Sequence, residues 1–278
     1  MTLRLGLVGH PVKHSLSPKM HGAWIAAAGL DATYEAYEVD PATPGGDLLA
    51  KITALGLSGV NLTVPFKERV LPLLDGLDPV ARRTGAVNTV VLGDGALWGS
   101  NTDVPGFMMS VREAGARLDG ATALILGAGG AARAVAFGLA EGGVAEILLL
   151  NRTVERAREV ALHLNRSCPQ VEFSGESLSR FPELSRRASV FAMTVSRPGL
   201  PAVRALDTRG VRADALWIDL NYWDPKPPRF AALREQGVRT VGGLSMLIHQ
   251  GALAFTAFTG APADPQVAWD VLSGGNRA

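Results

Sequence analysis

The sequence has very little of several features that mark specialised classes of protein. It contains one cysteine, Cys168, among 278 residues, so no disulfide can form within the chain. Its five histidines are scattered without the spacing of metal ligands, so we expect no metal site. Lys and Arg number 27 against 26 acidic residues, with no block of one sign, so we expect no nucleic-acid partner.

Export and membrane signals are also lacking. Residues 3–9 have the composition of a short strand rather than of a signal peptide. One long run without charged residues spans 240–263, but its glycines, His249 and Gln250 favour a buried helix over a membrane span. We therefore expect a cytoplasmic protein with no membrane partner. Cys168 lies in a polar turn, where a spectator role is expected.

The pattern along the chain indicates an α/β protein with two domains, for which 278 residues suffice. We predict strands over residues 5–9, 34–39, 59–64, 86–92, 122–126, 146–150, 188–194, 215–220 and 238–241. We predict helices over residues 17–29, 66–74, 131–140, 154–164 and 245–259. Ser17 is the expected N-cap of the first helix, and Pro65 is expected to open the second. The order predicts a first domain over 1–104, a dinucleotide-binding domain over 105–244, and a segment 245–278 that packs back on the first domain.

A glycine-rich turn is predicted between the 122–126 strand and the 131–140 helix. Gly127, Gly129 and Ala132 match the G-x-G-x-x-[GA] spacing, which permits a tight turn and brings a pyrophosphate close to a helix N-terminus. Glycines also simply make turns, but here a strand and a helix flank them as the dinucleotide motif requires. The expected cofactor contacts are five residues of this turn: Gly127, Ala128, Gly129, Gly130 and Ala131.

The residues that follow the next strand favour NADP over NAD. An NAD-selective site usually places Asp or Glu here for the ribose 2′-hydroxyl. This chain has Asn151, Arg152 and Thr153, with Arg156 one helical turn beyond Arg152. Guanidinium and hydroxyl donors suit a 2′-phosphate. The alternative is a simple helix start, with Thr153 as the N-cap and both arginines solvated.

A lysine at a predicted strand-to-helix corner is a candidate acid–base group. Residues 60–67 resemble a strand that runs into a helix opened by Pro65, which would place Lys67 in the first helical turn. The positive end of the helix dipole disfavours a cation there, so the ammonium would release a proton more readily. The alternative is a solvated surface lysine that Glu68 neutralises.

Two serines form a candidate anion site. Ser15 and Ser17 flank the predicted N-terminus of the first helix, where free N–H groups, the positive dipole end and two hydroxyls come together. The alternative for Ser17 is plain N-capping, whereas no such structural role is evident for Ser15. Asp103, just before Pro105, has the same alternative role as a helix N-cap.

Several motifs, in order along the chain, resemble the shikimate dehydrogenase family. They are G-H-P-V-K-H-S-L-S-P-K-M-H at 9–21, N-L-T-V-P-F-K at 61–67, G-A-V-N-T at 85–89, N-T-D-V-P-G at 101–106, the glycine turn, N-R-T at 151–153 and Q-G-A at 250–252. The resemblance implies two α/β domains around a cleft, the second a Rossmann-type NADP-binding domain. It also implies reversible, NADP-linked reduction of 3-dehydroshikimate to shikimate, a step of chorismate and aromatic amino acid biosynthesis.

The resemblance also implies roles for single residues. Lys67 would transfer the proton, and Asp103 would pair with Lys67 and with the ring hydroxyls. Ser15 and Ser17 would bind the substrate carboxylate. Four polar residues would contact the substrate ring: Thr63, Asn88, Tyr222 and Gln250. Further cofactor contacts would lie at Thr194 and Gly243. Considered singly, Thr63, Asn88 and Gln250 are as well explained as hydrogen-bonded structural residues.

Two loops depart from the family pattern. Residues 222–228 are Y-W-D-P-K-P-P where the family has Tyr-x-Pro-x-x-Thr-Pro, and residues 192–194 are A-M-T where it has Asn-Ala-Thr. They leave two alternatives open: a shikimate/quinate dehydrogenase acting on a related cyclic hydroxy acid, and a non-catalytic ligand-binding homologue. Lys67 and Asp103 argue against a mere binder, and the two serines favour shikimate. The expected partner is a small-molecule substrate, and formation of a homodimer is left open.

Overall fold

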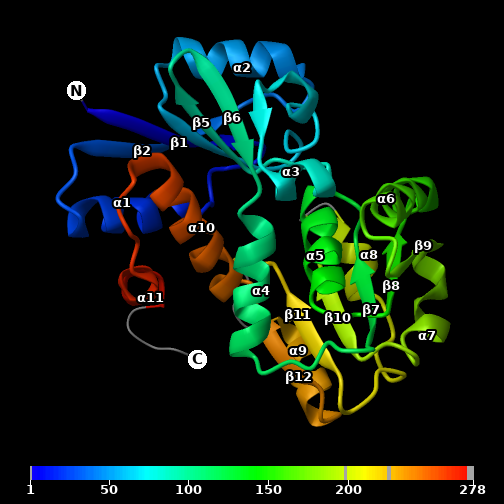
Figure 1. The fold of residues 1–278 in the computed structure, drawn as a ribbon. Helices are drawn as coiled ribbons and strands as arrows, with labels where there is room; N and C mark the ends of the chain where they lie inside the picture. Colours follow the sequence, from blue (N-terminus) through cyan, green and yellow to red (C-terminus); the bar gives the residue numbers. More distant parts are fainter. Residues whose placement is uncertain (1, 197–198, 224–226, 274–278) are drawn as a thin grey trace. The chain divides into compact units, whose positions relative to one another are not determined.

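The chain forms two compact units, each built on one six-stranded sheet (Figure 1). The computed structural model describes residues 2–196, 199–223 and 227–273. Unit 1 comprises Met1–Gly106 and Leu247–Ala278, and unit 2 comprises Phe107–Met246. The predicted α/β class is confirmed. Within the described ranges, none of the helices has both the length and the apolar character needed to cross a membrane.

The sheet of unit 1 has the strand order β2-β1-β3-β5-β6-β4. Its strands are β1 (Leu3–Gly9), β2 (Ala32–Glu38), β3 (Gly59–Leu62), β4 (Gly76–Leu77), β5 (Thr89–Gly93) and β6 (Ala96–Ser100). Its helices are α1 (Ser17–Ala27), α2 (Gly45–Ala54), the 3-10 helix η1 (Leu71–Leu73), α3 (Pro79–Thr84) and α11 (Pro265–Ser273). Two further helices, α4 (Asp103–Glu113) and α10 (Leu244–Thr259), belong partly to each unit.

Strand direction gathers several predicted site residues at one edge of this sheet. β1 is parallel to β3, and β5 is antiparallel to both β3 and β6. The carboxyl ends of β1, β3 and β6 therefore meet the amino end of β5 at the same edge, which is where α/β folds bind ligands. Ser15 follows β1, Thr63 and Lys67 follow β3, Asp103 follows β6, and Asn88 immediately precedes β5.

Alternate residues of β3 face opposite layers of unit 1. Val60 and Leu62 pack in one cluster with Ile52 of α2. Gly59 faces the other way, where an added Cβ would lie 2.3 Å from the ring of Phe258 in α10. Asn61 shares that second face, so this buried polar residue lies on the side of Phe258 in α10 rather than on the side of α2.

Unit 2 is a doubly wound parallel sheet with the order β12-β11-β10-β7-β8-β9. Its strands are β7 (Thr122–Leu126), β8 (Glu146–Asn151), β9 (Glu172–Ser177), β10 (Val190–Met193), β11 (Leu216–Asp219) and β12 (Arg239–Gly242). Its helices are α5 (Gly130–Glu141), α6 (Val154–Ser167), the 3-10 helix η2 (Leu178–Arg180), α7 (Phe181–Leu184), α8 (Leu200–Arg204) and α9 (Pro228–Glu235). The strand order reverses between β7 and β10, as in a Rossmann fold, so the predicted Rossmann-type domain is confirmed.

The predicted helix over 66–74 is wrong. Residues 64–70 form turns, and only the short η1 follows them. Phe66 and Val70 are both buried and stand four residues apart, which imitates helical periodicity. Pro72 has no N–H to donate to the carbonyl four residues earlier, so an α-helix begun at Phe66 would be broken there, and only the 3-10 helix η1 forms. Lys67 therefore lies outside any helix, and the helix-dipole argument for it does not hold.

Ser17 is not the N-cap of α1, contrary to expectation. Leu16 already has helical backbone angles, and its carbonyl accepts a hydrogen bond from the Met20 N–H at 3.0 Å. The helix thus begins one residue earlier than the serine and proline pattern indicates, and Ser17 is its first residue. The sequence patterns also gave no prediction for helices α2, α3, α4, α7, α8 and α9 or for strands β4 and β9.

Candidate active site

The centre of the candidate site is an ion pair between Lys67 and Asp103. The Lys67 Nζ lies 2.5 Å from the Asp103 Oδ2. The two side chains are 14% and 6% exposed, so little water screens their charges. The Val87 N–H donates to the Lys67 carbonyl at 2.8 Å and holds the turn that carries the lysine. An ammonium has three N–H donors, so Lys67 can hold Asp103 and still donate to a ligand.

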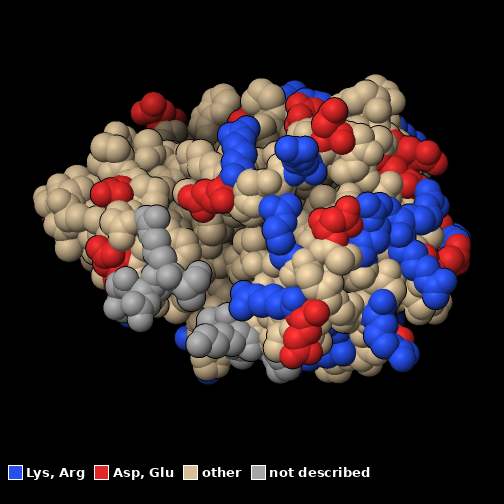
Figure 2. Space-filling view, turned by 90° about the horizontal axis from the view of Figure 1, so that it is seen from below, with Lys and Arg blue, Asp and Glu red and all other residues tan. Residues whose placement is uncertain are grey.

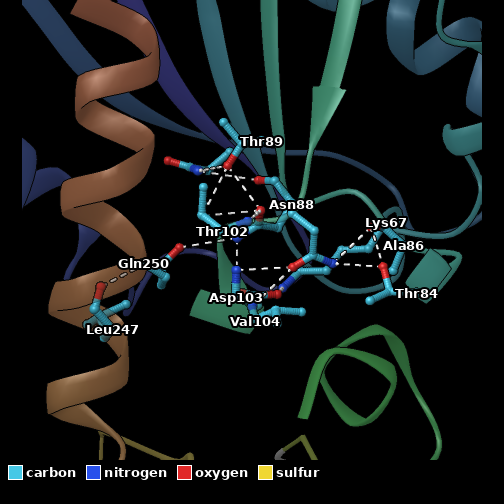
Figure 3. Close-up of polar contacts among 12 residues, drawn as sticks. Lys67, Thr84, Ala86, Asn88, Thr89, Thr102, Asp103, Val104, Leu247 and Gln250 are labelled. Carbon is cyan, nitrogen blue, oxygen red and sulfur yellow. Dashed lines mark hydrogen bonds and ion pairs between the residues drawn. The ribbon is translucent and has the colours of Figure 1, made fainter. Parts of the chain in front are cut away.

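Asp103 is held in place by the start of α4. The Asn101 Oδ1 accepts hydrogen bonds from the N–H groups of Asp103 and Val104, at 3.1 and 3.3 Å. The Asn101 Nδ2 donates to the Ala86 carbonyl at 2.9 Å, which ties this helix start to the segment before β5 (Figure 3). Asn101 thus satisfies the free N–H groups of the helix, and Asp103 contributes a negative charge at its positive end.

Asn88 binds the second oxygen of the same carboxylate. Its Nδ2 has two N–H donors and lies within hydrogen-bond distance of three acceptors: the Asp103 Oδ1 at 2.9 Å, the Thr102 Oγ1 at 2.9 Å and the Gln250 Oε1 at 3.3 Å. Gln250 in turn donates to the Leu247 carbonyl at 2.8 Å, one turn earlier in α10. The structure therefore brings four predicted residues into one polar cluster, in which Asn88 and Asp103 are buried and Lys67 and Gln250 are partly buried (Figure 3).

The two serines at the start of α1 form a small polar pair. The Ser15 Oγ accepts from the Ser17 N–H at 3.2 Å and donates to the Ser17 Oγ, also at 3.2 Å. Ser15 therefore does have a structural role at this helix start, which the sequence did not reveal.

Thr63 follows β3, and its N–H donates to the Val8 carbonyl at 2.9 Å. Carboxylate binding by the serines and ring binding by Thr63 stay predictions.

The glycine-rich turn of unit 2 has the geometry of a phosphate cradle. Gly127 has φ +123°, and an added Cβ would lie 2.4 Å from the Thr194 Oγ1, so only glycine fits there. Gly129 is the N-cap of α5, and an added Cβ would meet no protein atom within 4 Å. Packing alone does not demand Gly129, but open space beside free helical N–H groups suits a pyrophosphate.

The other predicted cofactor residues have different environments. Ala128 is buried, and Gly130 and Ala131 open α5. The Thr194 hydroxyl donates to the Leu126 carbonyl at 2.9 Å, across neighbouring strands. Gly243 is required by packing, because an added Cβ would lie 2.3 Å from the Leu220 carbonyl oxygen. Packing alone therefore explains the glycine at 243, and its contact with the cofactor stays a prediction.

Arginines are numerous in unit 2, and many of them are already paired. Basic and acidic side chains lie next to one another on the face shown in Figure 2. Four ion pairs of unit 2 are Arg180 with Glu183, Arg187 with Glu146, Arg209 with Asp207 and Arg212 with Asp214. By contrast, Arg152 and Arg156 are exposed and bond to none of the residues that the structure describes. The side chains of Arg152 and Arg156 are therefore available to bind an anion.

Asn151 donates to the Thr153 carbonyl at 2.9 Å, and Thr153 is the N-cap of α6 without a side-chain hydrogen bond.

Tyr222 lies in unit 2, where its ring meets that of Trp223 edge-on at 5.3 Å. Its predicted contact with substrate stays a prediction. Of the two atypical loops, Arg197 and residues 224–226 lie outside the described residues. In the ranges that are described, no group of three or more His, Cys, Asp or Glu could hold a metal ion.

Comparison with known proteins decides the family. Family models match three stretches: residues 7–90 match a shikimate dehydrogenase substrate binding domain, residues 110–220 match shikimate / quinate 5-dehydrogenase, and residues 243–272 match a shikimate 5'-dehydrogenase C-terminal domain. A shikimate dehydrogenase (NADP(+)) of Moorella thermoacetica is 45% identical over 277 residues, covering 96% of this chain and 92% of the relative. The chain belongs to the shikimate dehydrogenase family.

Solved structures of the family agree in fold over nearly the whole chain. Shikimate 5-dehydrogenase of Thermus thermophilus, solved with NADP(H) and shikimate, is 36% identical with a TM-score of 0.81 and covers 99% of this chain and 100% of that one. Quinate dehydrogenase of Corynebacterium glutamicum, solved with NAD, is 29% identical with a TM-score of 0.87 and covers 98% of this chain and 99% of that one. The resemblance inferred from motifs is confirmed.

The structure also reveals site residues that the sequence analysis did not single out. Asn101 and Thr102 stand directly before Asp103, and Thr89 directly follows Asn88, so all three lay inside recognised motifs. Their hydrogen bonds to the cluster became visible only in three dimensions.

Proposed function

We propose that this protein catalyses the NADP-dependent, reversible reduction of 3-dehydroshikimate to shikimate. The single observation that carries the proposal is the largely desolvated Lys67–Asp103 pair, with Asn88 and Gln250 bonded to the same cluster. The protein is an oxidoreductase of the shikimate dehydrogenase family. A binding protein without catalysis would have no need of a desolvated acid–base pair.

Proton transfer falls to Lys67. In reduction, its ammonium donates a proton to the oxygen of the ring ketone as that oxygen gains negative charge, and in oxidation the neutral amine takes the proton back. Asp103 orients the ammonium through its Oδ2 and offers its remaining acceptor capacity to a ring hydroxyl. Asn88 and Gln250 supply amide groups that match further hydroxyls. The serine pair and the N–H groups at the start of α1 bind the substrate carboxylate.

NADP, when bound, supplies or accepts the hydride. The residues of unit 2 suit this cofactor, because the Gly129 cradle admits a pyrophosphate and two exposed guanidiniums follow β8. Arg152 and Arg156 would hold the 2′-phosphate, which NAD lacks. Backbone N–H groups of the first turn of α5 would face the pyrophosphate.

One matrix of assays tests the proposal. Nicotinamide absorbance is followed with NADP and with NAD, in each case with shikimate and with quinate. We expect the highest kcat/KM for NADP with shikimate. The quinate alternative, motivated by the match to a quinate dehydrogenase, requires the highest kcat/KM with quinate. Shikimate binding without turnover under any condition would support the non-catalytic alternative instead.

Two further expectations belong to the proposal. A homodimer stays a prediction, which light scattering after size-exclusion chromatography tests. A cytoplasmic location is tested by fractionating cells that express the protein at native level.

A further inference from the structure

We propose that Thr89 is a positioning residue of this active site, and that it acts through a one-way chain of hydrogen bonds running from Tyr34 to Asp103. The inference rests on the proposed function, because it is tested by the kcat/KM for shikimate and by shikimate binding. Thr89 is fully buried, and its hydroxyl bonds to Asn61, Asn88 and Thr102 rather than to the ion pair itself. Its effect on the site passes through Asn88.

The hydrogen-bond chain links side chains from three strands of unit 1. The Tyr34 hydroxyl, on β2, donates to the Asn61 Oδ1 on β3 at 2.8 Å. Asn61 and Thr89 are direct partners in the antiparallel register of β3 and β5, and the Asn61 Nδ2 donates to the Thr89 Oγ1 at 3.1 Å. The Thr89 hydroxyl donates to the Asn88 Oδ1 at 3.0 Å. All four side chains are buried.

Groups that can only donate or only accept fix the direction of each bond. The backbone carbonyl of Asn88 can only accept, and it lies 3.3 Å from the Asn61 Nδ2. The Asn61 Oδ1 therefore faces Tyr34, and the tyrosine hydroxyl must donate to it. The Thr102 N–H can only donate, and it lies 2.8 Å from the Asn88 Oδ1. The Asn88 NH₂ therefore faces the carboxylate of Asp103 and donates to it.

Thr89 connects these two fixed amides. Its oxygen accepts from Asn61, so its single proton is free to point at the Asn88 Oδ1. Each bond that links the chain from Tyr34 to Asp103 thus runs in the same direction, and Lys67 contacts the other oxygen of the Asp103 carboxylate. Hydrogen bonds aligned in one direction polarise one another, and buried networks of this kind hold their members in one geometry. The chain therefore fixes the Asn88 amide and, through it, the Asp103 carboxylate.

Thr89→Val tests the chain, because valine keeps the shape of threonine and removes the hydroxyl. Asn88 keeps its bond from the Thr102 N–H, so the site should loosen rather than collapse. We expect kcat/KM for shikimate to fall about threefold to thirtyfold, the effect of losing one buried hydrogen bond. The KM for NADP should stay unchanged. Thr89→Ser retains the hydroxyl and should stay within about twofold of the wild type. Tyr34→Phe removes the first donor and should produce a smaller loss in the same direction.

The matched control is Thr259→Val, which removes a hydroxyl of unit 1 that bonds to the Phe255 carbonyl at 2.8 Å and to the Ala261 N–H. It should lower thermal stability without changing the shikimate parameters. A Thr89→Val variant that is destabilised but retains the wild-type kcat/KM would overturn the inference. The Thr89 hydroxyl would then contribute to stability alone. A Thr89→Ser variant as impaired as Thr89→Val would also overturn it, because the methyl group would then be responsible.

Calorimetric titration with shikimate, without cofactor, separates this inference from the proposed function. Wild-type protein that binds shikimate but turns over neither shikimate nor quinate would refute the proposed function alone. The inference then stands if Thr89→Val binds shikimate more weakly and Thr89→Ser binds it normally. It is overturned if all three proteins bind equally, or if the wild type does not bind shikimate.

Discussion

His21 should make unit 1 sensitive to mild acid. This residue of α1 is fully buried, its ring stacks on Tyr34 at 4.0 Å, and Trp24 meets it edge-on at 5.3 Å. Among the described residues, neither ring nitrogen has a hydrogen-bond partner. Burial lowers the pKa of His21 from 6.5 to about 3, because the charged ring would lose its water. His21 is therefore neutral in the folded protein but protonates in the unfolded chain as the pH falls.

The direction and size of this pH effect on stability follow from the number of protons that the folded and the unfolded chain bind. A folded-state pKa below the unfolded value means that the unfolded chain binds the extra proton, so stability is complete above pH 6.5 and is lost as the pH falls toward 3. Between pH 8 and pH 5, His21 should cost about 2 kcal/mol of the free energy of unfolding. This figure barely depends on the exact folded-state pKa, since pH 5 lies far above it.

His21→Phe keeps a ring against Tyr34 and removes the titration. The measurement is the free energy of unfolding in urea at pH 8 and pH 5, for wild type and variant. The variant should lose about 2 kcal/mol less than the wild type between the two values, because all other titrating groups cancel in the difference. Since Phe is larger than His and can overpack the site, His21→Leu serves as a second variant. An equal pH dependence in wild type and both variants would refute the argument.

Three further outcomes are expected. Lys67→Ala and Lys67→Met should lower kcat about 10²- to 10⁴-fold with little change in NADP affinity, and turnover within a few-fold of wild type would end the acid–base assignment. Arg152→Ala should raise the KM for NADP about tenfold to a hundredfold but spare NAD, and equal losses for both cofactors would contradict the phosphate contact. Replacing Ser15 and Ser17 together with Ala should weaken shikimate binding and leave NADP binding intact, as seen by calorimetry, and loss of the hydrogen bond from the Ser17 N–H to the Ser15 Oγ should cost about 1 kcal/mol in thermal unfolding.

Local sequence patterns were enough to predict five of the six strands and the two longest helices that lie wholly in the described part of unit 2. Strand β7, the turn at Gly127 and helix α5 depend on short-range patterns: a buried apolar run, glycines, then helix formers. Such patterns specify local structure because they involve neighbours in the chain. The motifs around Lys67, Asn88 and Asp103 likewise predicted that these three residues belong to one site, and the structure brings them into contact. Local pattern failed at residues 66–74, where Phe66 and Val70 imitate a helix that Pro72 prevents.

Which polar groups meet in the site depends on how the strands and helices pack together. Tyr34, Asn61 and Thr89 lie on three strands, and no spacing along the chain shows that they share one buried face. The strand order β2-β1-β3-β5-β6-β4 creates that face, and the helices over it remove the water. Burial of His21 and the contact between Asn88 and Gln250, 162 residues apart, arise in the same way. Hydrogen-bond direction and desolvation depend on three-dimensional neighbours, so they are properties of the folded chain rather than of its local patterns.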